Sequence, residues 1–224
     1  MLMATLSGMA EAPIPYVSRG GLKLAAALEA FAVSVHDRVC ADLGCNVGGF
    51  TDCLLQRGAA RVYAVDTGYG ALAWKLRQDP RVTVLERTNA LYFDPASNPG
   101  FTGCDLVVID LGWTRQKLAI PAALRWLGKI GARDRAAGVQ PLIVALLKPH
   151  YEAASGQLSG GRRGVLAEAD AEAITQRLLA EMPALGVTVV SHVRSPIRGG
   201  AGRGRQGNTE YLALLTPQAD MARC

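Results

Sequence analysis

Residues 38–50, RVCADLGCNVGGF, constrain the fold of this chain more than any other segment. A short apolar run ends at Asp42 and leads directly into a glycine-rich turn that opens a helix. Gly44, Gly48 and Gly49 supply the sharp turn and the close backbone approach that a ligand needs at the carboxyl end of a strand. The segment therefore predicts a mononucleotide-binding crevice.

A second apolar run supports a nucleoside ligand. The run RVYAVD ends at Asp66, about twenty residues on, where a carboxylate accepts hydrogen bonds from both ribose hydroxyls. Dinucleotide enzymes, methyltransferases and purely structural turns all place glycine between strand and helix. The G-x-G-x-x-G fingerprint of dinucleotide-binding proteins has glycines two and three positions apart, whereas the glycines of this turn stand at 44, 48 and 49. The spacing favours S-adenosylmethionine (SAM) over NAD or FAD, with a structural turn as the third interpretation.

Short strands and helices alternate along the chain. We expect helices at residues 21–31, 48–57, 70–78, 116–131 and 167–182, and strands at 38–43, 61–66, 81–86, 104–110, 141–149, 187–193 and 209–215. The run at 104–110 is almost continuously apolar, as in a parallel strand buried on both faces, and its end should lie beside Asp42. The pattern predicts a single α/β domain built from βαβ units.

Composition narrows the class of protein. The chain has 224 residues, half of them apolar, which suffices for one well-packed α/β domain. No apolar run approaches the roughly 18 residues of a membrane span and the start lacks a basic export signal, so we expect a soluble, cytoplasmic protein without a membrane role. The five cysteines form no C-x-x-C pair, so neither a disulfide framework nor a metal site is indicated.

Positive charge gathers in two glycine-rich segments. The net charge of +5 mildly favours a polyanionic partner. Residues 155–164 and 194–207 carry only positive charge and should form mobile loops, since neither can pack a core. They are either solvated surface loops or guides for a nucleic-acid backbone on its way to the crevice.

Longer segments carry a family resemblance. VSRGGLKLAAALEAF, DLGCNVGGFTDCLLQRGAARVYAVDTGYGALAWKLRQDPRV and LERTNA are followed by DLVVID, ALLKP, SPI and GNTEYL. From about residue 17 to 215 the chain resembles the FtsJ/RrmJ-like ribose 2′-O-methyltransferases, and within them the TlyA (hemolysin A) type of rRNA methyltransferase. The resemblance implies a Rossmann-like SAM-dependent methyltransferase fold, with a seven-stranded, mostly parallel sheet, an antiparallel last strand and helices on both faces. It also implies a flexible N-terminal segment at 1–15, the methyltransferase domain at 16–217 and a C-terminal tail at 218–224.

The family's Lys-Asp-Lys-Glu tetrad falls on Lys23, Asp110, Lys148 and Glu210. SAM carries an activated methyl group, so the protein has to align a ribose hydroxyl and ease removal of its proton. We hypothesise that Lys148 is the general base and that the two carboxylates orient the lysines. Taken singly, Lys23 could be a solvated helix residue, Glu210 an edge-strand charge and Asp110 a helix N-cap.

The resemblance also implies SAM as the cofactor. The candidate cofactor-binding residues are Asp42, Gly44, Asn46, Gly48, Gly49, Phe50, Asp66, Asn89 and Asp110. Asp66 should hold the ribose and Asn89 the adenine side, although Asn89 could simply form a turn. Tyr69 and Trp74 are candidates to flank the nucleoside, but aromatic residues at such helix positions more often belong to the core.

Three functions stay open on the sequence alone. The first is an RNA ribose 2′-O-methyltransferase acting on ribosomal RNA, and the second is a catalytically silent SAM-binding module for RNA or ribosome assembly. The third is a methyltransferase with a protein or small-molecule acceptor. A strong fall of substrate affinity with salt would favour RNA.

Two departures from the family bear on the substrate. The sequence LGWTRQ after Asp110 replaces a V-S-F type continuation, and residues 128–140 are expanded with basic residues. Trp113 could stack on a base or pack inside the protein. TlyA-type members usually begin with an S4-like RNA-binding domain, for which we expect no room before the resemblance starts.

Overall fold

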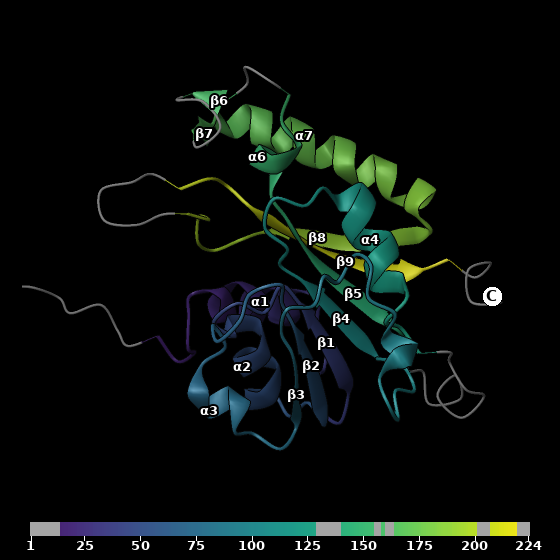
Figure 1. The fold of residues 1–224 in the computed structure, drawn as a ribbon. Coiled ribbons are helices and arrows are strands. Elements are labelled where there is room, and N and C mark those ends of the chain that lie inside the picture. Colours follow the sequence, from purple (N-terminus) through teal and green to yellow (C-terminus); the bar gives the residue numbers. More distant parts are fainter. Residues whose placement is uncertain (1–13, 129–139, 155–157, 160–163, 201–206, 219–224) are drawn as a thin grey trace, which may run out of the picture.

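A seven-stranded sheet forms the centre of the molecule (Figure 1). The computed structural model describes residues 14–128, 140–154, 158–159, 164–200 and 207–218. In spatial order the strands are β3 (Val82–Leu85), β2 (Arg61–Val65), β1 (Val39–Leu43), β4 (Leu106–Ile109), β5 (Leu142–Leu147), β9 (Tyr211–Pro217) and β8 (Val187–Arg194). Strands β1 to β5 pair in parallel, whereas β9 is antiparallel to both β5 and β8. The predicted mostly parallel sheet with an antiparallel last strand is confirmed.

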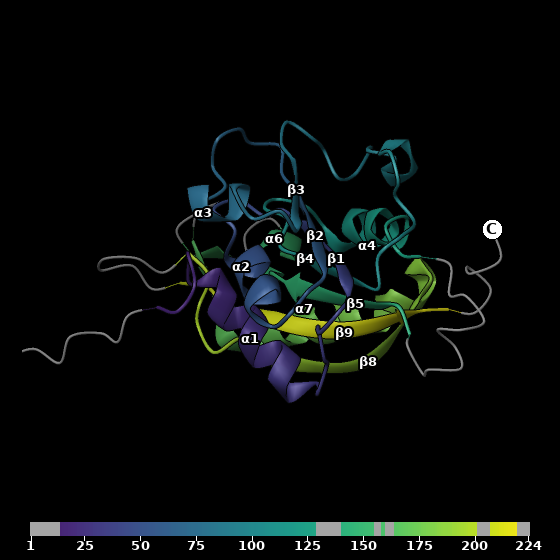
Figure 2. The ribbon, with the colours of Figure 1, turned by 90° about the horizontal axis from the view of Figure 1, so that it is seen from below.

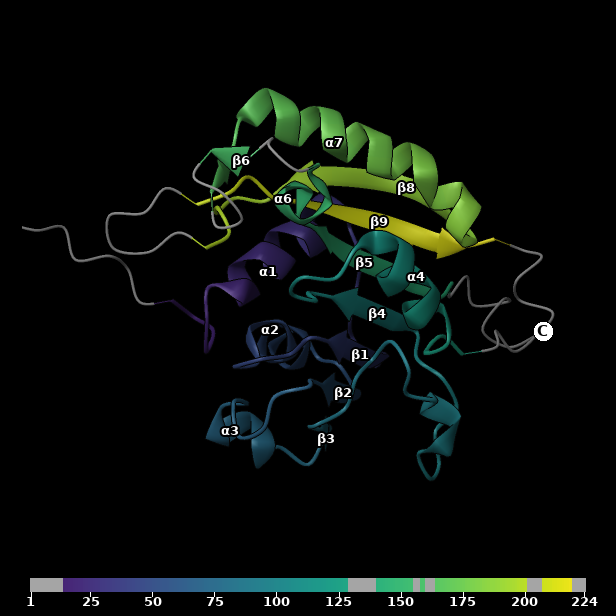
Figure 3. The ribbon, with the colours of Figure 1, turned by 45° about the horizontal axis from the view of Figure 1, so that its top comes forward.

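Helices cover both faces of this sheet. They are α1 (Gly20–Ala30), α2 (Gly49–Gln56), α3 (Trp74–Arg77), α4 (Gln116–Leu124), α6 (Pro149–Glu152) and α7 (Glu168–Glu181), with the short 3₁₀ helices η1 (Pro95–Ser97) and η3 (Met182–Leu185). Helices α1 and α2 lie against each other on one face of the sheet (Figure 2). Helices α4 and α7 pack on the opposite face, and Figure 3 shows α4 across the strands from α1.

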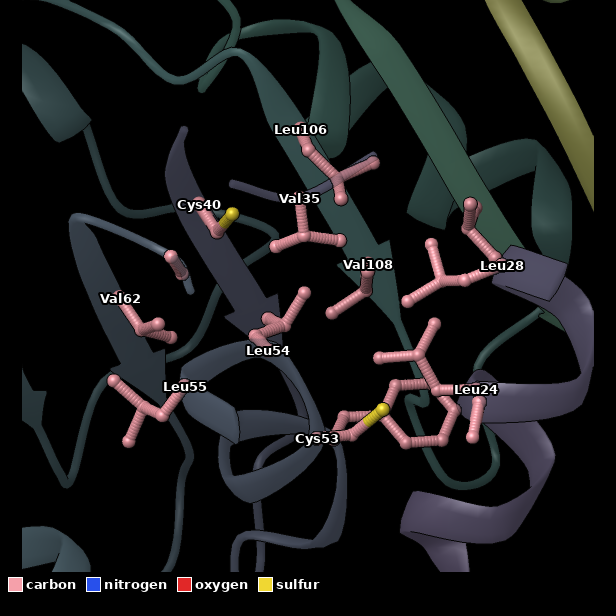
Figure 4. Close-up of a cluster of buried hydrophobic side chains, with 14 of the residues drawn as sticks. Leu24, Leu28, Val35, Cys40, Cys53, Leu54, Leu55, Val62, Leu106 and Val108 are labelled. Atoms are coloured by element: carbon pink, nitrogen blue, oxygen red, sulfur yellow. The ribbon is translucent and has the colours of Figure 1, made fainter. Parts of the chain in front are cut away.

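Alternating strand residues divide the core into two clusters. In β1, Cys40 faces the cluster under α1 and α2, whereas Leu43 faces the cluster under α4 and α7. Figure 4 shows the first cluster, in which Leu24 of α1, Leu54 of α2 and Val108 of β4 come together. Burial on both faces explains why the strands are almost continuously apolar rather than alternating with polar residues.

The strand order reverses between β1 and β4. The chain runs outward from β1 to β2 and β3, then returns to β4 beside β1 before it continues to β5. The Asp110 N–H donates to the Leu43 carbonyl at 2.9 Å, so the ends of β1 and β4 meet as the sequence predicts. The loops that follow diverge from this point, which in open α/β sheets is where ligands bind.

Two predicted helices are shorter than expected. The helix predicted at 70–78 is the four-residue α3, because Gly70 adopts a φ of 72° and Ala73 is extended with ψ 138°. The helix predicted at 116–131 ends at Leu124. There the Trp126 carbonyl accepts from the Cys104 N–H at 2.7 Å, and this bond draws the chain back toward the start of β4.

Other differences concern loops. The strand predicted at 141–149 ends at Leu147, because Pro149 begins α6. The basic segment 155–164 contributes a strand, β6 (Leu158–Ser159), which pairs with β7 (Val165–Leu166). The rest of that segment, 155–157 and 160–163, lies outside the described residues. So do 201–206 of the second basic segment, 129–139 of the expanded region, and 1–13 and 219–224 of the predicted terminal segments.

A fully buried carboxyl group sits within β1. One oxygen of Asp42 accepts from the Thr51 hydroxyl at 2.7 Å, while Oδ1 has no partner among the described residues. Burial raises the pKa of Asp42 to about 7, and the Thr51 hydrogen bond opposes this effect. Because the pKa is about 3.9 in an unfolded chain, the stability that protonated Asp42 contributes is fully present below that value and is lost as pH rises through about 7.

The Asp42→Asn variant should remove this pH dependence, because an amide does not titrate. From about pH 5 to about pH 8 the wild type should lose about 3 kcal/mol of unfolding free energy relative to the variant. Urea unfolding of both proteins at the two pH values measures the difference. Parallel changes in both proteins would show that Asp42 is ionised at the same pH whether folded or unfolded.

Candidate active site

Four charged side chains from distant parts of the sequence line one cavity of about 730 Å³. Lys23 comes from α1, Asp110 follows β4, Lys148 follows β5 and Glu210 precedes β9. Lys23 Nζ lies 2.5 Å from Glu210 Oε2, and Lys148 forms an ion pair with Asp110. The structure thus brings the whole predicted tetrad together as two lysine–carboxylate pairs, while its catalytic role stays a prediction.

The sequence after β5 explains the position of Lys148. Pro149 starts α6, and Lys148 is its N-cap residue with φ −116° and ψ 84°, so the chain turns sharply at the strand end. Besides its pair with Asp110, the Lys148 ammonium donates to the Leu111 carbonyl at 3.3 Å. These contacts hold the amine over the cavity at the carboxyl ends of β4 and β5.

Glu210 is the most deeply buried member of the tetrad, with only 3% of its surface exposed. Burial raises the pKa of Glu210, and the positive charge of Lys23 opposes that effect. The backbone of Gly199 packs directly on the carboxylate, since a Cβ at Gly199 would lie 1.8 Å from Glu210 Oε1. A pair of hydrogen bonds between Gly199 and Asn208 fixes this approach, at 2.9 and 2.8 Å.

The predicted ribose ligand, Asp66, lies in the same cavity. Its Oδ2 accepts from the Asn46 N–H at 2.9 Å and its Oδ1 from the Gly68 N–H at 2.7 Å. Both oxygens are therefore oriented by the backbone, and each keeps lone-pair capacity for a hydroxyl donor. Asn89 also lines the cavity, and its side-chain oxygen accepts from the Leu91 N–H at 3.0 Å, as a turn-forming residue does.

The remaining predicted cofactor residues divide into two groups. Gly44 and Asn46 line the main cavity, and with Gly49 and Phe50 they also line an adjoining cavity of about 240 Å³. Asp42 and Gly48 line neither cavity. Gly48, with φ 101°, packs on the side chains of α3 and its preceding turn, and Asp42 bonds to α2 through Thr51. Asp42 and Gly48 therefore pack behind the glycine-rich turn, against α2 and α3, and do not face either cavity.

Three aromatic residues considered in the sequence analysis are exposed, which excludes the core alternative for each. Trp113 lines the tetrad cavity, whereas Tyr69 and Trp74 line neither cavity, and their contact with a nucleoside stays a prediction. Tyr69 and Trp74 are each 72% exposed, and Tyr69 carries the Arg87 guanidinium 4.2 Å above its ring. Trp113 is 73% exposed and stacks on Tyr151 with ring centroids 4.8 Å apart. Both residues of this stacked pair line the cavity of the tetrad, and Tyr151 was not anticipated from the sequence.

His150 is a further residue that lines the tetrad cavity. Burial lowers its pKa to about 4, and the charges of Lys148 and Lys23 add to the effect. The imidazole is therefore neutral at physiological pH. The proximity of Lys148 was visible in the sequence, but that of Lys23 was not, because Lys23 is distant along the chain.

Two other features bear on function. Within the described ranges, no cluster of three or more His, Cys, Asp or Glu side chains has a metal-binding arrangement. None of the helices in those ranges has the length and apolar character needed to cross a membrane. Cys40, Cys45, Cys53 and Cys104 are buried free thiols, as expected.

The relatives of this chain include rRNA methyltransferases and a protein named as a hemolysin. The chain is 42% identical over 205 residues to the "Putative rRNA methyltransferase YqxC" of Bacillus subtilis. This match covers 91% of this chain and 66% of the relative. It is 42% identical over 208 residues to the 16S/23S rRNA (cytidine-2′-O)-methyltransferase TlyA of Mycobacterium tuberculosis, and this match covers 92% of this chain and 70% of the relative. A solved structure, "Putative hemolysin from Streptococcus thermophilus", is 36% identical with a TM-score of 0.81 and covers 94% of this chain and 70% of that one.

The chain thus spans about two thirds of the length of the curated relatives described above. Residues 16–214 match the model of the FtsJ-like methyltransferases. This match takes in all seven strands of the sheet up to the middle of β9, and it includes all four residues of the tetrad. The chain belongs to the FtsJ-like methyltransferase family.

Proposed function

We propose that this chain transfers a methyl group from SAM to a ribose 2′-hydroxyl of ribosomal RNA in the cytoplasm. The observation that carries the proposal is the single cavity shared by Lys23, Asp110, Lys148, Glu210 and the nucleoside residue Asp66. A relative with 42% identity is named as an rRNA (cytidine-2′-O)-methyltransferase. The cavity joins an acceptor half, with two lysines, to a cofactor half at the switch point of the sheet.

The cofactor half has the chemistry that SAM requires. Asp66 offers carboxylate oxygens to ribose hydroxyls, and Gly44 lines the cavity without a side chain. A Cβ at Gly44 would lie 2.6 Å from the Asp110 carbonyl oxygen, and the φ of Gly44 is 93°. When bound, SAM supplies a methyl group already activated on a sulfonium.

The tetrad provides the proton chemistry and the alignment. Lys148 accepts the proton of the 2′-hydroxyl as that oxygen attacks, which it can do only as a neutral amine. Asp110 holds the Lys148 amine in place, and Glu210 holds Lys23 on the other side of the cavity. Lys23 then stabilises the negative charge that develops on the acceptor oxygen. Positioning supplies much of the rate enhancement.

The Lys148→Arg variant tests the general base, because arginine keeps the charge next to Asp110 but does not deprotonate in a useful pH range. We expect methyl transfer from labelled SAM to ribosomal RNA to slow by about a hundredfold or more, with SAM affinity little changed. Lys75→Arg is the matched control, since Lys75 pairs with Asp52 on α2 and lines neither cavity.

Two outcomes of this experiment would count against the account. Near-normal turnover by Lys148→Arg would exclude Lys148 as the base. A wild type that binds SAM but labels no ribosomal RNA or subunit would reject the proposed function. That result would favour a silent SAM-binding module or an acceptor other than RNA.

The Gly199→Ala variant tests the position of Glu210. The added methyl group would displace the Glu210 carboxylate from Lys23, so we expect kcat to fall by about tenfold or more, with little change in the KM for SAM. Gly128→Ala is the control, because its Cβ would make only an ordinary contact, 3.4 Å from the Thr102 carbonyl. In a Glu210→Ala background, Gly199→Ala should not lower kcat any further. Additive losses would show that Gly199 acts through another group.

A further inference from the structure

Apart from the tetrad cavity and the smaller one that adjoins it, a cavity of about 350 Å³, here called the second cavity, lies on the α4 and α7 side of the sheet. The loops after β4 and β5 contribute to both this cavity and that of the tetrad. Trp113 and Tyr151 line the first cavity, while Arg115 and Glu152, one or two residues farther along each loop, line the second. The proposed function makes no use of this second cavity.

A buried polar atom in this cavity lacks a partner. Gln116 is 5% exposed and lines the cavity, and its Nε2 donates to the Leu146 carbonyl of β5 at 3.2 Å. That bond fixes the orientation of the amide. Gln116 Oε1 then has no hydrogen-bond donor in the part of the chain that the structure describes. Buried acceptors without a donor are uncommon and costly, so a ligand with an N–H or O–H group would complete the site.

The charges around the cavity favour an anion. Arg115, Lys117 and Arg177 line it together with Glu152 and Glu181. Both acids are already engaged, because Glu152 accepts from the first N–H of α4 at 2.7 Å and Glu181 lies 3.7 Å from Arg177. Arg115 and Lys117 are exposed and form no ion pair with any described residue. Two cations beside a helix N-terminus are well placed to contact a phosphate.

The remaining wall is apolar. Leu178 of α7 and Met182 and Leu185 of η3 also line the cavity and give it its apolar surface. A volume of about 350 Å³ is in the range of small-ligand pockets. The cations suit the phosphate of a nucleotide, the lone buried acceptor suits a sugar hydroxyl or a base amine, and the apolar residues suit the face of the base.

We propose that this cavity binds a nucleotide of the substrate RNA that lies close in the strand to the methylated one, an inference that rests on the proposed RNA substrate. The phosphate lies between Arg115 and Lys117, and a 2′-hydroxyl or exocyclic amine donates to Gln116 Oε1. The RNA strand then passes from the tetrad over the stacked Trp113–Tyr151 pair into the second cavity. The site sets the register in which a nucleotide reaches Lys148.

Binding of fluorescently labelled ribosomal RNA to the full chain, without SAM, tests this directly. Arg115→Glu and Lys117→Glu should each weaken binding about tenfold and lower the slope of log K against log salt by about one or more. Arg61→Glu is the matched control, because it makes the same charge change at the start of β2, at the end of the parallel strands opposite the loops that line both cavities. Gln116→Met changes no charge and should weaken binding about fivefold, with thermal unfolding as the check on folding.

Each outcome decides the inference. Weaker binding by the Arg115, Lys117 and Gln116 variants, with Arg61→Glu close to wild type, supports it. Equal losses of affinity in all three charge-reversal variants would show only general electrostatic attraction and would overturn the inference. Unchanged RNA binding by folded Gln116→Met, Arg115→Glu and Lys117→Glu would also overturn it. So would a wild type that does not bind RNA. Methyl transfer by the wild type is measured in parallel. RNA binding at this cavity without methyl transfer would reject the proposed function and leave the nucleotide site standing.

Discussion

The close approach of Gly44 to the backbone of Asp110 sets the geometry on which the site depends. A side chain at position 44 would collide with the Asp110 carbonyl oxygen, and the Asp110 N–H is bonded to the last residue of β1. Asp110 therefore stands where the cofactor turn and the end of β4 meet, at the reversal of strand order. From there it reaches Lys148 across the end of β5. One tight backbone contact thus joins the nucleoside half of the cavity to its acceptor half.

Charge balance within the cavity explains the pairing of its residues. Glu210 is buried between α1, the loop at Gly199 and β9, and an isolated carboxylate there would be strongly disfavoured. Lys23 offsets that cost, and removing either partner leaves a buried, unpaired charge, which typically destabilises a protein by about 3 to 5 kcal/mol. Burial lowers the pKa of His150, and the charges of Lys148 and Lys23 add to that effect. The tetrad is consequently a coupled electrostatic unit, and its members act by holding one another in position.

Much of the fold followed from the sequence because apolar runs, glycine turns and strand-terminal carboxylates are local signals. The meeting of the segments that end at Asp42 and Asp110 followed from these signals, and the antiparallel last strand followed from the family resemblance. Helix ends were less predictable, since α4 stops where the Trp126 carbonyl bonds to the distant Cys104. The sequence left Tyr69, Trp74 and Trp113 open between core and exposed positions, because the spacing of aromatic residues does not distinguish a core face from an exposed one, and the structure shows all three exposed. The pairing of lysines with carboxylates, and the lone acceptor of Gln116, depend on contacts between segments far apart in sequence.

The central claim is that the tetrad directs the methyl group to a ribose oxygen and not to a base. The most direct measurement is complete digestion of ribosomal RNA methylated by the wild type, followed by mass spectrometry of the nucleosides and a test of alkali resistance. The account predicts a 2′-O-methylated nucleoside within an alkali-resistant dinucleotide, absent from RNA treated with Lys148→Ala. A methyl group on a base, or a labelled product that alkali cleaves normally, would contradict it.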